Sequence, residues 1–171
     1  LICIKMEFQD IRKDYKKEKL RRKDLAHSPF VQFEKWFAQA IKADIPDVNA
    51  MSLATCVDNK PHSRIVLLKG VVNENLRFFT NYNSNKGQQL DQNPNCALLF
   101  HWVDLERTVR IEGVASKISE SESTAYFLSR PKGSQISAMA SNQSEIIPSR
   151  DFLEEKLLSI VTPAKPENWG G

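Results

Sequence analysis

The spacing of the apolar residues changes at Ala50 and changes back near Ser119, and this limits the folds that the chain can adopt. Between these points the apolar residues form short strand-like runs, which are separated by residues that favour turns. The predicted strands are Met51–Val57, His62–Val72, Leu76–Thr80, Cys96–Trp102 and Arg107–Ile118. Successive strands joined by short turns favour an antiparallel sheet that curls into a barrel.

Helical spacing precedes and follows the strand-like region. Ser28 and Pro29 suit an N-cap and a first helical turn, and apolar residues then recur every three or four positions as far as Ile41. A short helix with Ser84 as its N-cap is predicted as far as Asp91, and further helices over residues 119–130, 134–141 and 149–160. We therefore expect a mainly β fold with peripheral helices, in the α+β class.

The composition is ordinary for a globular protein. The 171 residues suit one domain, with 41% hydrophobic and 26% charged residues. No apolar run approaches the roughly 20 residues that cross a bilayer, so no membrane partner is expected. The apolar stretch at the start is too short and too soon interrupted to be a signal peptide.

Cysteine usage favours a reducing compartment. Cys3, Cys56 and Cys96 form neither a disulfide framework nor a metal-like spacing, which is typical of a cytoplasmic protein. Cys56 and Cys96 lie in apolar runs and are expected to be buried as small hydrophobic residues. The three histidines are isolated, and we predict no metal site.

The net charge of +3 belongs to the N-terminal arm, residues 1–25, which holds nine Lys/Arg and five Asp/Glu. Phe8, Ile11 and Tyr15 give this arm a narrow helical stripe, and residues 26–171 are expected to form a single domain. A basic arm is compatible with nucleic-acid binding. The interspersed acids favour a solvated helix of mixed charge instead, so we expect no nucleic-acid partner.

Two segments combine cations and hydroxyls in a way that suits phosphate. The first runs from Arg64 to Lys69; these two residues are five apart, so a bulge or twist is needed before both reach one ligand. The second runs from Thr80 to Lys86 and opens a helix, whose unpaired N–H groups attract anions. Taken alone, these segments are more typical of charges at strand ends and of an ordinary capped helix.

A third segment has the donors of a phosphate clamp. Tyr126 and Arg130 are four apart and share a helical face, and Ser134 follows just after the break at Pro131. A guanidinium fork, a phenol and a hydroxyl suit a phosphate. An arginine that contacts the last carbonyls of its own helix is an equally good interpretation.

In this order and spacing, the three segments resemble the pyridoxamine 5'-phosphate oxidase family. The resemblance extends from about Asp10 to Gly171, and further matching segments are Leu20–Leu25, Leu105–Arg107, Gln143-Ser144 and Trp169–Gly171. It implies an FMN-binding split β-barrel that forms a homodimer with FMN at the interface. It also implies oxidation of pyridoxamine or pyridoxine 5'-phosphate to pyridoxal 5'-phosphate, in which the flavin takes a hydride and oxygen reoxidises it to give hydrogen peroxide.

The resemblance also implies which residues form the site. FMN would be bound by Arg64, Ile65, Val66, Leu67, Leu68, Lys69, Phe79, Thr80, Lys86, Gln143 and Ser144. The phosphate of the substrate would be bound by Tyr126, Arg130 and Ser134, with Lys69 beside both flavin and substrate. No residue is assigned as a catalytic acid or base.

Two positions and the C-terminus depart from the family pattern. The family commonly has a basic residue in place of Asn85 and a flavin-contacting glutamine in place of Thr108. Its chains also continue beyond the element that ends here at Gly171, so either a tail is omitted or this is a natural short form. One alternative to the oxidase is a non-catalytic protein of the same fold that binds flavin or pyridoxal phosphate. Another is a protein that binds a partner through its basic arm.

Overall fold

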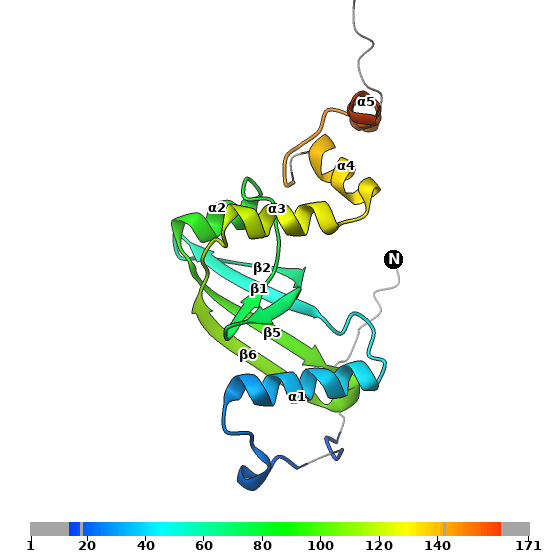
Figure 1. The fold of residues 1–171 in the computed structure, drawn as a ribbon. Helices are drawn as coiled ribbons and strands as arrows, with labels where there is room; N and C mark the ends of the chain where they lie inside the picture. Colours follow the sequence, from blue (N-terminus) through cyan, green and yellow to red (C-terminus); the bar gives the residue numbers. More distant parts are fainter. Residues whose placement is uncertain (1–13, 18, 142, 162–171) are drawn as a thin grey trace, which may run out of the picture. The chain divides into compact units, whose positions relative to one another are not determined.

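The computed structural model describes residues 14–17, 19–141 and 143–161 (Figure 1). These residues belong to two compact units, one within residues 1–48 and 100–109, the other within residues 49–99 and 110–171. In the described residues no helix is long and apolar enough to span a membrane. The cytoplasmic location and the division into an arm and a single domain stay predictions.

Helices precede and follow a central run of strands, as the sequence indicates. In chain order the described elements are a 3₁₀ turn at Arg22–Asp24, α1 (Pro29–Lys42), β1 (Ala50–Val57), β2 (Lys60–Leu67), β3 (Gly70–Val72), β4 (Asn75–Arg77), α2 (Asn85–Gln92), β5 (Asn95–Trp102), a 3₁₀ turn at Val103–Leu105, β6 (Arg107–Val114), α3 (Glu120–Ser129), α4 (Lys132–Ala140) and α5 (Arg150–Val161). The predicted α+β class is confirmed.

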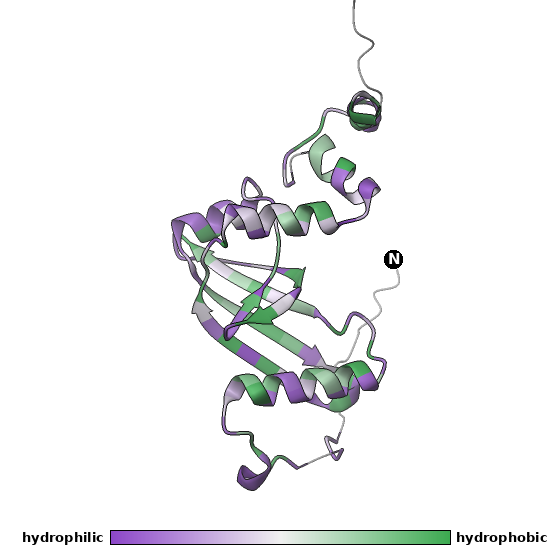
Figure 2. Ribbon diagram, in the orientation of Figure 1, coloured by the Kyte–Doolittle hydropathy of each residue, from purple (hydrophilic) through white to green (hydrophobic). Residues whose placement is uncertain are grey.

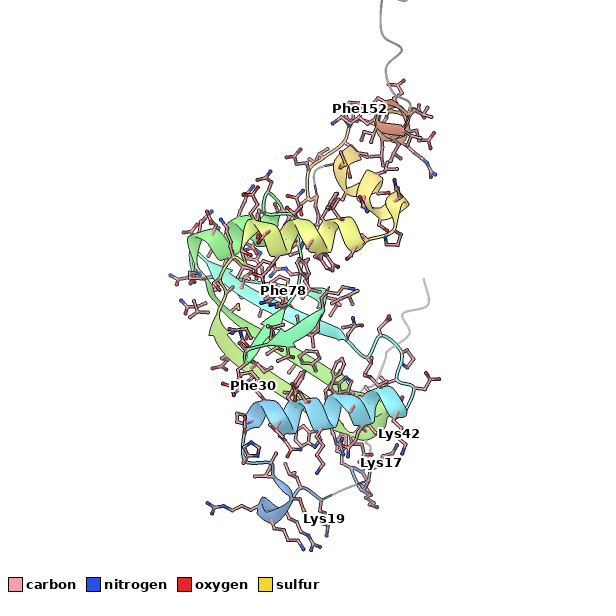
Figure 3. All side chains as sticks on the ribbon, in the orientation of Figure 1. Lys17, Lys19, Phe30, Lys42, Phe78 and Phe152 are labelled. Atoms are coloured by element: carbon pink, nitrogen blue, oxygen red, sulfur yellow. The ribbon has the colours of Figure 1, made fainter. Side chains whose placement is uncertain are left out.

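Helix α1 begins where the sequence predicts. The hydroxyl of Ser28 accepts a hydrogen bond from the backbone N–H of Phe30 at 3.2 Å, and Pro29 occupies the first turn. Hydrophobic and hydrophilic residues alternate along the helix in Figure 2. Phe30 and Lys42 mark its two ends in Figure 3.

The core of the first unit is aromatic. Phe33 on α1 lies with its ring centroid 5.2 Å from that of Phe100 and 6.2 Å from that of Trp102, both on β5. The indole N–H of Trp102 donates to the carbonyl of Val48 at 3.0 Å, so this buried ring keeps its hydrogen bond. Aromatic packing therefore holds α1 against the end of β5.

The strands form a four-stranded sheet in the order β2-β1-β5-β6 and a two-stranded sheet of β3 and β4. Strands β1 and β2 are antiparallel and join through Asp58 and Asn59, which have φ values of 51° and 59°. Asn73 and Glu74 join β3 to β4 with φ values of 49° and 61°. Two-residue turns with positive φ match the twist of a hairpin, which explains Asp58, Asn59 and Asn73 at three of these four positions.

One face of the larger sheet provides the core of the second unit. Met51 and Leu53 on β1 are 1% and 0% exposed, and Val66 and Leu98 lie buried on the neighbouring strands. Leu53 pairs with Leu98, so their side chains share a face of the sheet. The period of two in the sequence of β1 therefore matches its burial.

The predicted strand His62–Val72 is wrong as a single element, because the chain leaves the larger sheet after Leu67. The N–H of Leu68 donates to the carbonyl of Asn49 at 2.8 Å, and the Asn49 side chain donates to the carbonyl of Leu68 at 3.0 Å. The N–H of Lys69 donates instead to Arg77 on β4, at 2.8 Å. Leu68 thus bonds to the residue that precedes β1, whereas Lys69 bonds to β4, so β3 starts a separate hairpin.

Other boundaries differ from the prediction by a few residues. Strand β4 ends at Arg77 rather than Thr80, and β6 ends at Val114 rather than Ile118. Helix α4 begins at Lys132 rather than Ser134, directly after Pro131. Cys56 and Cys96 are half-buried free thiols rather than fully buried ones.

The predicted helix in the N-terminal arm is wrong over residues 14–17 and 19, which are not helical. Tyr15 is 75% exposed, whereas Phe8 and Ile11 lie outside the described residues. Within the first unit, the backbone N–H of Lys17 donates to the Glu106 carboxylate at 3.0 Å, and its ammonium donates to the carbonyl of Asp104. This part of the arm is positioned by polar contacts and not by an apolar stripe.

Candidate functional site

The start of α2 is closely packed against the loop before it. The hydroxyl of Ser84, which is fully buried, donates to the carbonyl of Asn81 at 2.6 Å and accepts from the N–H of Gly87 at 3.3 Å. A Cβ at position 87 would lie 2.2 Å from the carbonyl oxygen of Tyr82, so the loop leaves no room for a side chain. The predicted N-cap at Ser84 is confirmed.

Three of the predicted FMN residues meet at this helix start. The ammonium of Lys86 donates to the amide oxygen of Gln143 at 2.8 Å, and the hydroxyl of Thr80 donates to the same oxygen at 3.2 Å. Thr80 and Ser84 also have their hydroxyls 3.3 Å apart. Residues that are 57 and 63 positions apart in the chain are thereby connected.

Arg64 is held by neutral acceptors on two neighbouring elements. Its Nη1 donates to the carbonyl of Leu53 at 3.1 Å and to the hydroxyl of Thr55 at 2.8 Å, both on β1. Its Nη2 donates to the amide oxygen of Gln89 on α2 at 2.6 Å. The guanidinium therefore connects the sheet with α2 in the second unit.

Arg64 and Lys86 form a pair of cations that repel each other. Burial lowers the pKa of Lys86, and the positive charge of Arg64 lowers this pKa further. The pKa of Arg64 is also lowered by burial. Within the described residues, the ion pairs involve other cations and leave these two without a carboxylate. We call Arg64, Thr80, Lys86 and Gln143 the cationic cluster; its charge suits an anion.

The predicted segment from Arg64 to Lys69 alternates between buried and exposed residues. Val66 and Leu68 are buried, whereas Ile65 and Leu67 are 66% and 42% exposed. Lys69 is exposed and belongs to the connection between the two sheets. The break in the strand therefore separates Lys69 from the regular end of β2.

The predicted substrate residues lie on or just after α3. The ring of Tyr126 stacks on that of Phe79, with centroids 3.4 Å apart and planes 7° apart. The guanidinium carbon of Arg130 lies 5.9 Å from the centroid of the Phe127 ring, and Ser134 is half-buried in α4. No direct hydrogen bond joins Tyr126, Arg130 and Ser134, all of which lie in the described part.

The predicted FMN residue Ser144 and the two positions that depart from the family pattern are exposed. Ser144 follows Gln143 in a turn and has a φ of 74°, while Asn85 is exposed in the first turn of α2. In the first unit, the hydroxyl of Thr108 lies 3.0 Å from Nδ1 of His101. Thr108 thus has a polar partner on the neighbouring strand.

Thr55 and Gln89, the two side chains that accept hydrogen bonds from Arg64, were not predicted from the sequence. Thr55 is 3% exposed and lies on the same face of β1 as Leu53, so a polar residue stands among the buried apolar residues of this face. Gln89 lies three residues after Lys86 and therefore on the same side of α2. A buried polar side chain needs a partner, which is the signal that could have indicated both.

Comparison with known proteins shows the family of the chain. The family model described as pyridoxamine 5'-phosphate oxidase matches residues 37–160. The chain belongs to the pyridoxamine 5'-phosphate oxidase family. A relative from Nostoc sp. named pyridoxine/pyridoxamine 5'-phosphate oxidase is 48% identical over 95% of this chain and 79% of its own length. One of the same name from Cupriavidus necator is 47% identical over 96% of this chain and 81% of its own.

Solved structures confirm the split-barrel fold predicted from the resemblance to this family. PhzG from Burkholderia lata, solved with tetrahydrophenazine-1-carboxylic acid, has a TM-score of 0.77 and 25% identity over 82% of this chain and 71% of its own. An FMN-binding protein from Nostoc punctiforme, described as related to pyridoxamine 5'-phosphate oxidase, has a TM-score of 0.58. It is 17% identical over 76% of this chain and 73% of its own, and shows likeness of fold alone.

Replacing Ser84 with alanine tests how much its N-cap stabilises the start of α2. Ser84→Ala removes the cap and leaves the carbonyl of the half-buried Asn81 without its hydroxyl partner. We expect a loss of about 1–3 kcal/mol in the free energy of unfolding, measured with urea.

Ser119→Ala is the matched control, because Ser119 caps α3 in the same way but is exposed. We expect a loss of about 0.5–1 kcal/mol there. Equal losses of unfolding free energy in the two variants would show that the burial of Ser84 adds nothing to the stability of its cap.

Proposed function

We propose that this chain binds FMN and oxidises pyridoxamine or pyridoxine 5'-phosphate to pyridoxal 5'-phosphate. The proposal rests chiefly on the cationic cluster, in which Arg64 and Lys86 lie close enough to repel each other and have no carboxylate partner in the described residues. Relatives at 46–49% identity carry the name of this oxidase. The site and the relatives thus support the same activity.

The residues of the cluster fit the phosphate of FMN. A phosphate monoester is close to a dianion at neutral pH and accepts several charge-assisted hydrogen bonds. Arg64 and Lys86 would provide the charge, and the hydroxyl of Thr80 would provide another donor. The adjacent start of α2 favours an anion as well, through its backbone N–H groups.

The substrate residues would lie next to those that bind FMN. Phe79, a proposed FMN residue, stacks directly on Tyr126, a proposed substrate residue. Tyr126, Arg130 and Ser134 would bind the phosphate of the substrate, with Lys69 beside both ligands. The parallel rings thus support a shared site within the second unit.

The chain itself would contribute binding and orientation. FMN, when bound, would supply the redox chemistry, taking up a hydride from the substrate and passing the electrons to oxygen to give hydrogen peroxide. The phosphate-binding residues would fix each ligand at one end, so that the two reacting rings meet in a defined geometry. No side chain of the described site needs to act as an acid or a base in this account.

Anaerobic addition of pyridoxamine 5'-phosphate tests the proposed activity. The flavin absorbance of the FMN-loaded protein should bleach, because the substrate reduces the flavin. For Arg130→Ala we expect FMN to stay bound and the substrate concentration for half-maximal bleaching to rise by about 10- to 100-fold, since a hydrogen bond to a charged group contributes about 1.5–3 kcal/mol.

Two outcomes would contradict the proposal. Bound flavin that stays oxidised would indicate the alternative, a non-catalytic flavin-binding protein on the same fold. If Arg130→Ala leaves the substrate concentration for half-maximal bleaching unchanged, Arg130 does not belong to the substrate site.

Lys86→Ala tests the assignment of the cationic cluster to FMN. The variant removes one of the two proposed charges, so we expect the dissociation constant for FMN to rise about 10- to 100-fold in a fluorescence titration. Lys132→Ala is the control, because Lys132 is an exposed lysine at the start of α4. Equal FMN affinity in the two variants would exclude Lys86 from the site.

We also propose that two copies of the chain associate. Ser52 on β1 pairs with Ile65 on β2 and with Leu99 on β5, so these side chains share one face of the larger sheet. On this face Ile65, Leu67 and Leu99 are 66%, 42% and 39% exposed, and β2 is an edge strand. A patch of exposed apolar side chains on a sheet face is typical of an interface between proteins.

Analytical ultracentrifugation checks this association. The unmodified chain should sediment as a dimer, and Leu99→Lys should shift it toward the monomer, because the substitution would bury a charge in the interface. Leu128→Lys is the control, since Leu128 is 64% exposed on α3. A wild-type monomer, or equal effects of the two substitutions, would contradict the proposed interface.

A further inference from the structure

Gln89 occupies a special position on α2. Its amide oxygen accepts from Nη2 of Arg64 at 2.6 Å and from the hydroxyl of Thr55 at 2.7 Å. The same hydroxyl accepts from Nη1 of Arg64 at 2.8 Å, which closes a ring of three side chains. Because Thr55 is almost fully buried, its hydroxyl cannot exchange these partners for water.

The hydrogen bonds among these three side chains determine which N–H groups of Arg64 remain available to a ligand. A guanidinium has five N–H groups in a planar fork, and three of them donate to Leu53, Thr55 and Gln89. Nε and one N–H of Nη2 have no acceptor among the described residues. A planar group that is fixed along one edge can direct its other donors at a ligand with little further loss of side-chain freedom.

The acceptors around Arg64 are all neutral. Two are a backbone carbonyl and a hydroxyl, and the third is an amide oxygen, although a carboxylate would bind a guanidinium more strongly. A carboxylate would also cancel the charge that an anionic ligand requires. Its absence agrees with the lowered pKa of Lys86, on which the charge of Arg64 acts.

We propose that Gln89 is a positioning residue, which orients Arg64 toward the phosphate of FMN while leaving its positive charge uncancelled. This inference rests on the proposed function, because it takes the phosphate of FMN as the anion. Gln89 itself touches no ligand in this account and acts only through Arg64. The absence of charge on the Gln89 side chain is therefore as important as the position of its amide oxygen.

Gln89→Glu separates charge from geometry. Glutamate has nearly the same shape and keeps an oxygen beside Arg64 and Thr55, but it adds a negative charge to the ring. We expect the dissociation constant for FMN to rise about tenfold or more, because the charge of Arg64 is neutralised. Riboflavin, which lacks the phosphate, should bind as it does to the unmodified protein, and the melting temperature should not fall.

Gln92→Glu is the matched control, since it adds the same charge at an exposed position of the same helix. It should leave the affinity for FMN within about twofold, because exposed charges in water interact weakly. Gln89→Leu is the second variant, which removes the acceptor without adding charge; it should weaken FMN binding and leave riboflavin unchanged.

The comparison of FMN with riboflavin distinguishes the possible failures. If Gln89→Glu retains wild-type affinity for FMN, or loses FMN and riboflavin equally, the positioning role is overturned while the proposed function stands. If the unmodified protein binds FMN no more tightly than riboflavin, both are overturned, because no phosphate is then bound by Arg64.

Discussion

The hydrogen bonds of Arg64 determine where the candidate site forms. They connect β1, which provides Leu53 and Thr55, to α2, which provides Gln89. Because α2 also carries Lys86, the connection brings a second cation beside the first. The fully buried cap at Ser84 then fixes the loop that carries Thr80. Strand β1, the start of α2 and the loop that carries Thr80 are therefore connected in the region of the Arg64 guanidinium.

Keeping two cations together is unfavourable for the protein alone. Partial burial weakens their hydration, and their mutual repulsion lowers the pKa of Lys86. Elsewhere in the described part of the chain some cations pair with acids, as Arg77 does with Glu122 and Lys117 with Asp91. The proximity of Arg64 and Lys86 without an acid between them is understandable if an anionic ligand compensates their charge, and functional sites often contain such pairs.

Local signals in the sequence predicted much of the fold, but contacts between distant residues could not be predicted. The caps at Ser28 and Ser84 depend on residues two or three positions away, so they were visible in the sequence. The break after Leu67, where Leu68 bonds to Asn49 and Lys69 bonds to Arg77, involves such distant partners and was not predicted. The family resemblance indicated Arg64 and Lys86, yet the neutral ring of Thr55 and Gln89 and the stacking of Phe79 on Tyr126 appear only in three dimensions.

The most direct test of the account is phosphorus NMR of FMN bound to the protein, recorded as the pH is lowered. Free FMN takes up a proton on its phosphate near about pH 6. If Arg64 and Lys86 contact this phosphate, their charges favour the dianion, and its signal should stay that of the dianion to about pH 5 or below. A signal that titrates like free FMN while the flavin remains bound would show that the cationic cluster does not bind the phosphate.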